Sequence, residues 1–139
     1  MRATLAIAIG LCAASAAAET SARGLYMLHC SGCHGRDGAG SKVGRVPPFA
    51  GVVGHFAGAP EGRRYLVLVP GVANSGLSDA DAARVLNHVV REWGEGAPRP
   101  AYSAGEVAAI RRSRVDDIVA LRVRIIDDLA RRGVRILLK

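Results

Sequence analysis

Two cysteines and a histidine lie close together near the start of the chain, in the segment HCSGCHG at residues 29–35. Cys30 and Cys33 are separated by two residues, and His34 follows directly. Thiols at this spacing could form a disulfide, a redox-active dithiol, part of a zinc site or the attachment point of a cofactor. The rest of the sequence distinguishes these four uses.

Three of the uses fit the surrounding sequence poorly. A disulfide here would close a loop so short that it would hardly restrict the unfolded chain. A redox-active pair normally opens a helix that follows a strand, and no alternation of strands and helices surrounds residues 30–33. Zinc needs four ligands, and no second cysteine or cysteine–histidine pair stands at a suitable spacing.

The remaining interpretation is C-x-x-C-H, the attachment signature of haem c. In this signature Cys30 and Cys33 form thioethers with the two vinyl groups of the haem, and His34 is the proximal ligand of the iron. The spacing suits that chemistry because one turn of helix carries both thiols and the adjacent imidazole. The sequence therefore predicts covalent haem c and its iron as the cofactor.

The first residues have the pattern of a secretory signal peptide. Arg2 precedes an apolar run over residues 5–14, and small residues up to Ala18 offer cleavage sites. The run is shorter than the roughly 20 residues that span a membrane. We expect residues 1–18 to be removed, which places the mature protein in the periplasm without membrane association. Cys12 is lost with this segment.

The chain resembles the class I c-type cytochromes, which are small monohaem proteins of the bacterial periplasm. The motifs that carry the resemblance are LYMLHCSGCHGRDGAG, VPPF and GLSDADAARVLNHVVREW. It implies an all-α, cytochrome c-like haem domain over residues 19–95, followed by a linker at 96–102. It also implies that the backbone carbonyl of Pro47 or Pro48 accepts a hydrogen bond from the ligand histidine, fixing its tautomer.

One feature of that family is missing. Class I cytochromes usually place a methionine on the distal side of the haem, but the only methionines are Met1 and Met27. Met27 stands three residues before Cys30, too close to the attachment point to reach across the ring. Where the ligand is expected, Val69 precedes Pro70. The usual histidine–methionine coordination is therefore excluded.

Several residues could take the place of the methionine. His55, in a glycine-rich stretch, is the candidate sixth ligand, and an open iron is an equal alternative. Asn74 could hold a water or a bound ligand by a hydrogen bond. His29 is adjacent to Cys30 and, like Met27, is too close to the attachment point to reach across the ring, so we expect it to face solvent or the propionate side of the haem. His88 lies off the apolar stripe of a helix expected at residues 78–93, which predicts an exposed side chain.

The sequence outside the cysteine motif predicts several helices. Residues 20–34 and 61–69 are expected to be helical, the second by resemblance, whereas 35–60 is expected to be an irregular loop around the cofactor. Residues 103–139 are expected to form a C-terminal helical extension, opened by a capping box of Ser103 and Glu106.

The extension carries an apolar stripe, which must be buried against the haem domain or against another chain. The stripe consists of Val115, Ile118, Val119, Leu121, Ile125, Ile126 and Leu129. Residues 103–139 also hold nine Lys or Arg and five Asp or Glu. These charges form either a solvated face of paired side chains or a docking surface for an acidic redox partner.

These observations predict an electron carrier rather than an enzyme. The formal net charge of +7 suits docking to an acidic surface of a periplasmic dehydrogenase or a respiratory-chain redox protein. Nucleic acid is not an expected partner of an exported haem protein with 4% aromatic residues. Two alternatives stay open. One is an open haem that binds NO, CO or peroxide, with weak peroxidase activity; the other is a haem subunit of a dehydrogenase complex.

Overall fold

The computed structural model describes residues 21–44, 46–95 and 99–136. These residues form helices and no strand, which confirms the all-α prediction. The expected signal peptide at 1–18 lies outside the described residues. The helices are α1 (Ala22–His29), α2 (Ser31–His34), α3 (Val53–Ala57), α4 (Pro60–Leu68), α5 (Pro70–Ala73), α6 (Asp79–Trp93), α7 (Ala104–Arg112) and α8 (Ile118–Arg131). None of them is long and apolar enough to cross a membrane.

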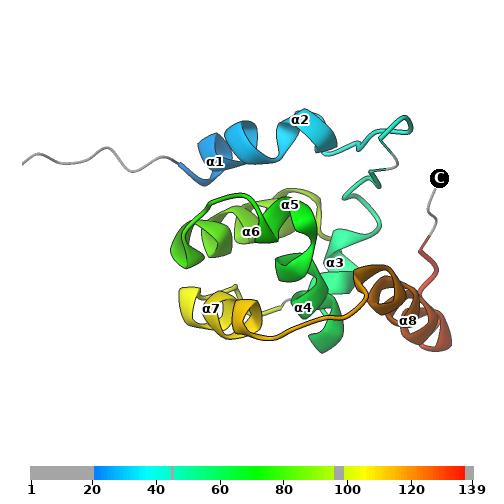
Figure 1. Ribbon diagram of the computed structural model, residues 1–139. Helices are drawn as coiled ribbons and strands as arrows, with labels where there is room; N and C mark the ends of the chain where they lie inside the picture. Colours follow the sequence, from blue (N-terminus) through cyan, green and yellow to red (C-terminus); the bar gives the residue numbers. More distant parts are fainter. Residues whose placement is uncertain (1–20, 45, 96–98, 137–139) are drawn as a thin grey trace, which may run out of the picture.

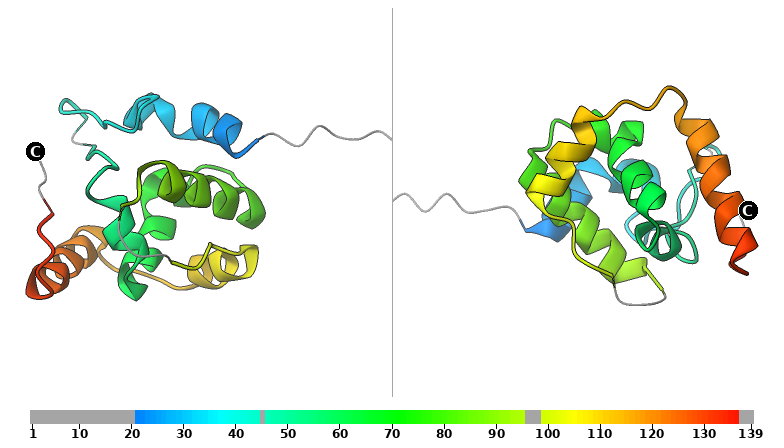
Figure 2. Two further views of the ribbon diagram at one scale, coloured as in Figure 1. Left: turned by 180° about the vertical axis from the view of Figure 1, so that it is seen from behind. Right: turned by 90° about the horizontal axis from the view of Figure 1, so that it is seen from below.

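Helix α6 lies at the centre of the arrangement. Its first turn is stabilised because the Ser78 hydroxyl accepts a hydrogen bond from the Asp81 N–H at 3.1 Å. Helix α1 packs along one side of α6 and α7 along the other, while α8 packs on α4 (Figures 1 and 2). Helix α6 is therefore covered by segments that are far from it in sequence.

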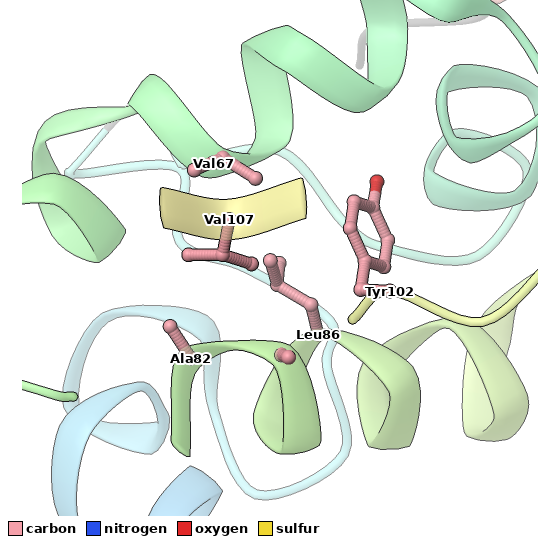
Figure 3. Close-up of a cluster of buried hydrophobic side chains, with 6 residues drawn as sticks. Val67, Ala82, Leu86, Tyr102 and Val107 are labelled. Atoms are coloured by element: carbon pink, nitrogen blue, oxygen red, sulfur yellow. The ribbon is translucent and has the colours of Figure 1, made fainter. Parts of the chain in front are cut away.

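Three apolar clusters fill the interior. The first joins α4, α6 and α7 (Figure 3) and contains Val67, Ala82, Ala83, Leu86, Tyr102 and Val107. The second joins α1, α3 and α6 and contains Leu25, Tyr26, Val53, Val85 and Val89. The third joins α3 to α8 and contains Phe56, Leu121, Ile125 and Leu129. The second cluster borders the cysteine motif, since Cys30 packs against it.

The C-terminal extension, which was predicted to be helical, consists of two helices. Helix α7 ends at Ser113, whose backbone is extended, and α8 begins after Asp117, whose carboxylate accepts from the Val119 and Ala120 N–H groups. Arg64 holds the turn between them by donating to the Arg114 carbonyl. The stripe is thereby broken, and Val119 is 67% exposed.

The apolar face of α8 is covered by this chain itself. Leu121, Ile125 and Leu129 pack on Phe56 of α3, and all four side chains are buried. The prediction left open whether the preceding part of this chain or another chain would cover the stripe, and the structure shows that α3 of this chain covers it. Ser103 caps α7 as predicted, since its hydroxyl accepts from the Glu106 N–H at 3.1 Å.

Two further predictions need correction. Residues 35–60 are not irregular throughout, because α3 forms there and buries Val53 and Phe56. A helix of five residues is too short to show the 3.6-residue period of apolar side chains that identifies a helix in a sequence. The expected helix at 20–34 is interrupted at Cys30, which separates α1 from α2. The predicted helices at 61–69 and 78–93 are confirmed as α4 and α6.

Candidate haem site

Cys30, Cys33 and His34 are held on one turn of helix. The Cys30 N–H donates to the Tyr26 carbonyl at 2.9 Å, so the motif directly continues α1. The N–H groups of Cys33 and His34 both donate to the Cys30 carbonyl, at 3.2 Å and 3.0 Å. The two cysteines are free thiols, with Cys33 exposed and Cys30 partly buried. Both sulfur atoms are therefore available for a covalent attachment.

The thiol chemistry does not favour a redox or zinc site. Burial raises the pKa of the Cys30 thiol to about 11, with a smaller contribution from Cys33. Catalytic and metal-binding cysteines react as thiolates and have a lowered pKa. Among the described residues, no three His, Cys, Asp or Glu side chains are grouped so as to hold a metal ion. Two thiols on one turn, without a disulfide between them, fit thioether attachment better.

The His34 imidazole is oriented by its neighbours. It stacks on the Phe49 ring, with centroids 4.1 Å apart and planes 16° from parallel. Burial lowers the pKa of His34, and the nearby Pro47 carbonyl partly offsets this. Its Nδ1 atom is nevertheless buried with no hydrogen-bond partner of ordinary geometry in the described structure. The ring is thus a neutral imidazole beside a carbonyl that could accept from Nδ1, and Nε2 would then face a metal.

Close backbone packing brings Pro47 to the histidine. Gly40 has a φ of +75°, and a Cβ at this position would lie 2.7 Å from the Pro47 carbonyl oxygen. The Gly40 N–H donates to the His34 carbonyl at 2.9 Å. A side chain at Gly40 would separate these two segments, so glycine is needed where the loop returns to the motif.

An aromatic cluster supports this turn from the side of α6. The Tyr26 ring lies 5.0 Å from Trp93 and 6.3 Å from Phe49, measured between centroids. Phe49 also stacks on Trp93 at 5.4 Å. The Tyr26 hydroxyl donates to the Gly35 carbonyl at 2.5 Å, which ties α1 to the residue after the motif. Sequence reasoning missed this cluster, because no spacing in the sequence shows that Tyr26 on α1 and Trp93 on α6 come together.

His88 belongs to the same cluster, so the expectation of an exposed side chain is wrong. It is 6% exposed, and its ring lies 5.8 Å from Tyr26 and 6.0 Å from Trp93. Burial lowers its pKa, and Arg91 lowers it further against the opposing effect of Glu92. The sequence pattern identified one apolar face of α6, but α1 covers a second face.

The remaining predicted residues lie elsewhere. His55 lies on α3 and lines a hollow of about 390 Å³ together with Arg63, Arg99 and Leu129. Phe49 and Pro47, which lie beside His34, are not among the residues that line the hollow with His55. Asn74 is exposed at the end of α5, and His29 is exposed at the end of α1 as expected.

Two observations of this structure indicate that the turn from Cys30 to His34 fits a covalent haem. The paired free thiols match its two attachment points, and the unpartnered Nδ1 of His34 lies beside a carbonyl that would orient an iron-binding imidazole. Pro47, rather than Pro48, is the proline whose backbone carbonyl affects the pKa of the His34 imidazole.

Comparison with known proteins shows which family the chain belongs to. No family model matches the chain. It is 32% identical to cytochrome c-552 of Thermus thermophilus over 108 residues, which covers 62% of this chain and 81% of that protein. A second cytochrome c-552 of the same species is also 32% identical, with 72% of its length covered. With this identity over most of the relative's length, the chain belongs to the c-type cytochromes.

Proposed function

We propose that this chain is a monohaem electron carrier rather than an enzyme. Cys30 and Cys33 hold the haem as thioethers, and His34 binds the iron as proximal ligand. The bound haem supplies a centre that takes up and releases one electron by cycling between Fe(II) and Fe(III). The observation that carries the proposal is the one-turn motif, with free thiols beside an imidazole whose Nδ1 lacks a partner.

The side chains around His34 have defined tasks in this proposal. The Pro47 carbonyl accepts a hydrogen bond from Nδ1, which leaves Nε2 for the metal and raises its basicity. Phe49 stacks on the ring and limits its rotation. Tyr26 anchors the residue that follows the motif through its bond to the Gly35 carbonyl. Together they hold the ligand in one orientation in both oxidation states, which keeps reorganisation small.

The distal side is proposed to lack methionine. Met27 lies on α1, one turn before Cys30, and Val69 and Pro70 stand where the family usually has its ligand. The sixth position is then open or weakly ligated, with His55 as the candidate side chain. A histidine there would lower the potential relative to methionine, because axial ligand identity sets the potential.

Location and partners follow from the same sequence features. We propose export by the signal peptide at 1–18 and a haem domain at 19–95, joined by a linker at 96–102 to the extension at 103–139. The proposed location is the periplasm. The proposed partner is a dehydrogenase or respiratory-chain protein with an acidic docking surface, supported by the formal net charge of +7.

Attachment is tested by mass spectrometry of the denatured protein. The wild type should retain the mass of haem after denaturation, because thioethers survive unfolding. Cys30→Ala and Cys33→Ala should each lose one of the two covalent links, and the double variant should release its haem entirely. A wild-type protein that loses its haem on denaturation would refute the attachment.

A second candidate function rests on the missing methionine: an open haem that binds NO, CO or peroxide. Absorption spectra of the oxidised and reduced protein, with and without CO, decide between the two. A low-spin spectrum unaffected by CO supports the carrier, and His55→Ala then tests the sixth ligand. A high-spin spectrum that shifts with CO supports ligand binding or peroxidase chemistry.

The third alternative, a subunit of a dehydrogenase complex, is weakened because α8 buries its apolar face on this chain.

A further inference from the structure

We propose that a hollow between α6 and residues 99–102 binds a small oxyanion, through the Tyr102 hydroxyl and the Arg99 guanidinium. The hollow measures about 330 Å³ and is lined by Arg63, Asn87, Arg91, Arg99 and Tyr102, among others. No acidic side chain is among the described residues that line it. This site shares no residue with the C-x-x-C-H turn, although Arg63 and Arg99 also line the hollow beside His55.

Two buried donors in this hollow have no acceptor. Tyr102 is 4% exposed, and its hydroxyl has no hydrogen-bond partner in the described part of the chain. Nε of Arg99 is likewise buried and unpartnered there. Buried polar groups are nearly always hydrogen-bonded, so two orphan donors on residues that line one hollow indicate an acceptor that the described residues do not supply. Figure 3 shows the Tyr102 ring beside Leu86, with its hydroxyl at the end of the ring that is far from Leu86.

The Tyr102 ring is fixed in place before any ligand binds. The Asn87 side chain accepts from the Tyr102 N–H at 2.7 Å and donates to the Tyr102 carbonyl at 2.9 Å. The Arg63 guanidinium lies 3.9 Å from the centroid of the ring. Burial raises the pKa of Tyr102, so its hydroxyl remains a donor at neutral pH. The donor is therefore preorganised, which reduces the entropic cost of binding.

The charge of the hollow favours an anion over water. The carboxylate of Glu106 already neutralises Arg63 through two hydrogen bonds of 2.7 Å. Arg99 donates to the Glu95 backbone carbonyl at 2.6 Å but has no ion pair among the described residues. Arg91 also lines the hollow and adds a second positive charge. Its side chain is 65% exposed, and its Nε lies 4.0 Å from the Glu92 carboxylate. A guanidinium with a free N–H recognises the oxygens of phosphate, sulfate or carboxylate.

The size of the hollow limits the ligand. About 330 Å³ lies at the lower end of the range of small-molecule sites, which suits an inorganic oxyanion or a compact carboxylate rather than a large cofactor. Since the guanidinium and hydroxyl both donate, the ligand must present at least two acceptor oxygens. Inorganic phosphate is the appropriate probe.

Binding is measured with the haem-loaded protein by calorimetric titration with phosphate at constant ionic strength, with chloride as the balancing anion. Tyr102→Phe and Arg99→Gln should each weaken phosphate binding by about tenfold or more, because each removes a hydrogen bond to a charged ligand. The matched controls are Tyr65→Phe and Arg124→Gln. Tyr65 packs on Phe56 outside the hollow, and Arg124 is exposed on α8. Both controls should bind like the wild type.

Thermal unfolding gives a second readout. Tyr102→Phe keeps the ring in its cluster and beneath Arg63, so it should unfold at or above the wild-type temperature without phosphate. Added phosphate should raise the unfolding temperature of the wild type and leave that of Tyr102→Phe almost unchanged. If the wild type shows no binding beyond that of chloride, or if all the variants bind equally, the hollow holds only water and the proposal is wrong.

Discussion

The ion pair between Arg63 and Glu106 joins α7 to α4, and its removal should destabilise the protein measurably. Arg63 on α4 donates from Nε and Nη2 to the two carboxylate oxygens of Glu106 on α7, each at 2.7 Å. Nη1 donates to the Pro100 carbonyl at 2.9 Å, so the guanidinium also holds the chain before α7. We predict that Glu106→Gln weakens this junction while leaving the helix cap at Ser103 intact.

The magnitude follows from the burial of the pair. Arg63 is 12% exposed and Glu106 is 31% exposed. Breaking a fully buried pair costs about 3–5 kcal/mol, whereas exposed pairs contribute about 0–1 kcal/mol. Because water reaches Glu106, and because glutamine can keep one of the two hydrogen bonds, we expect a loss of about 2 kcal/mol. Glu106→Ala should cost more, since it leaves the Arg63 charge without a partner.

The assay is urea unfolding of the haem-loaded protein followed by far-UV circular dichroism. Glu61→Gln is the matched control, because Glu61 forms an ion pair that is open to solvent. Its side chain is 60% exposed, and its carboxylate lies 3.6 Å from the Arg64 guanidinium. The control should change the free energy of unfolding by less than about 0.5 kcal/mol. If Glu106→Gln is no more destabilising than Glu61→Gln, the pair does not hold α7 to α4 and the reasoning fails.

The same pair predicts a pH dependence of stability. The hydrogen bonds from Arg63 are the main reason that the pKa of Glu106 is lowered from its ordinary value of 4.5. A carboxyl whose pKa is lower in the folded state contributes stability that is fully present above 4.5 and is lost as the pH falls through the folded-state value. The difference between wild type and Glu106→Gln should therefore be largest near neutral pH and shrink below pH 4.5. A difference that stays constant down to acid unfolding would contradict this assignment.

Two further predictions concern packing around the fold and the site. Phe56 is 2% exposed between α3 and α8, so Phe56→Ala should lower the free energy of unfolding by about 3–5 kcal/mol, whereas Val119→Ala at a 67% exposed position should have little effect. Equal effects in urea unfolding would show that α8 is not packed as described. Gly40→Ala places a Cβ 2.7 Å from the Pro47 carbonyl oxygen and should reduce the ratio of haem to protein. Gly71→Ala, which meets no atom within 4 Å, should retain the wild-type ratio; equal ratios would contradict the close packing at residue 40.

Local features of the sequence were sufficient for the attachment turn and most of the helices. The two cysteines and the histidine occupy one turn because their spacing is that of a helix. Ser78 and Ser103 begin α6 and α7 because the side chain of each accepts a hydrogen bond from an N–H three residues ahead. Each of these interactions spans only a few residues, so the sequence alone can determine it.

The tertiary structure decided what no local pattern contains. His88 is buried because α1, more than fifty residues earlier, covers a second face of α6. The C-terminal stripe is divided because Asp117 starts a new helix and Arg64 holds the turn. Arg63 of α4 lines one hollow together with Arg99 and Tyr102 of a segment more than thirty residues later. The sequence therefore determined the turn that carries Cys30, Cys33 and His34 through short-range spacing, whereas burial and charge at His88 and Tyr102 depended on which distant segments pack against them.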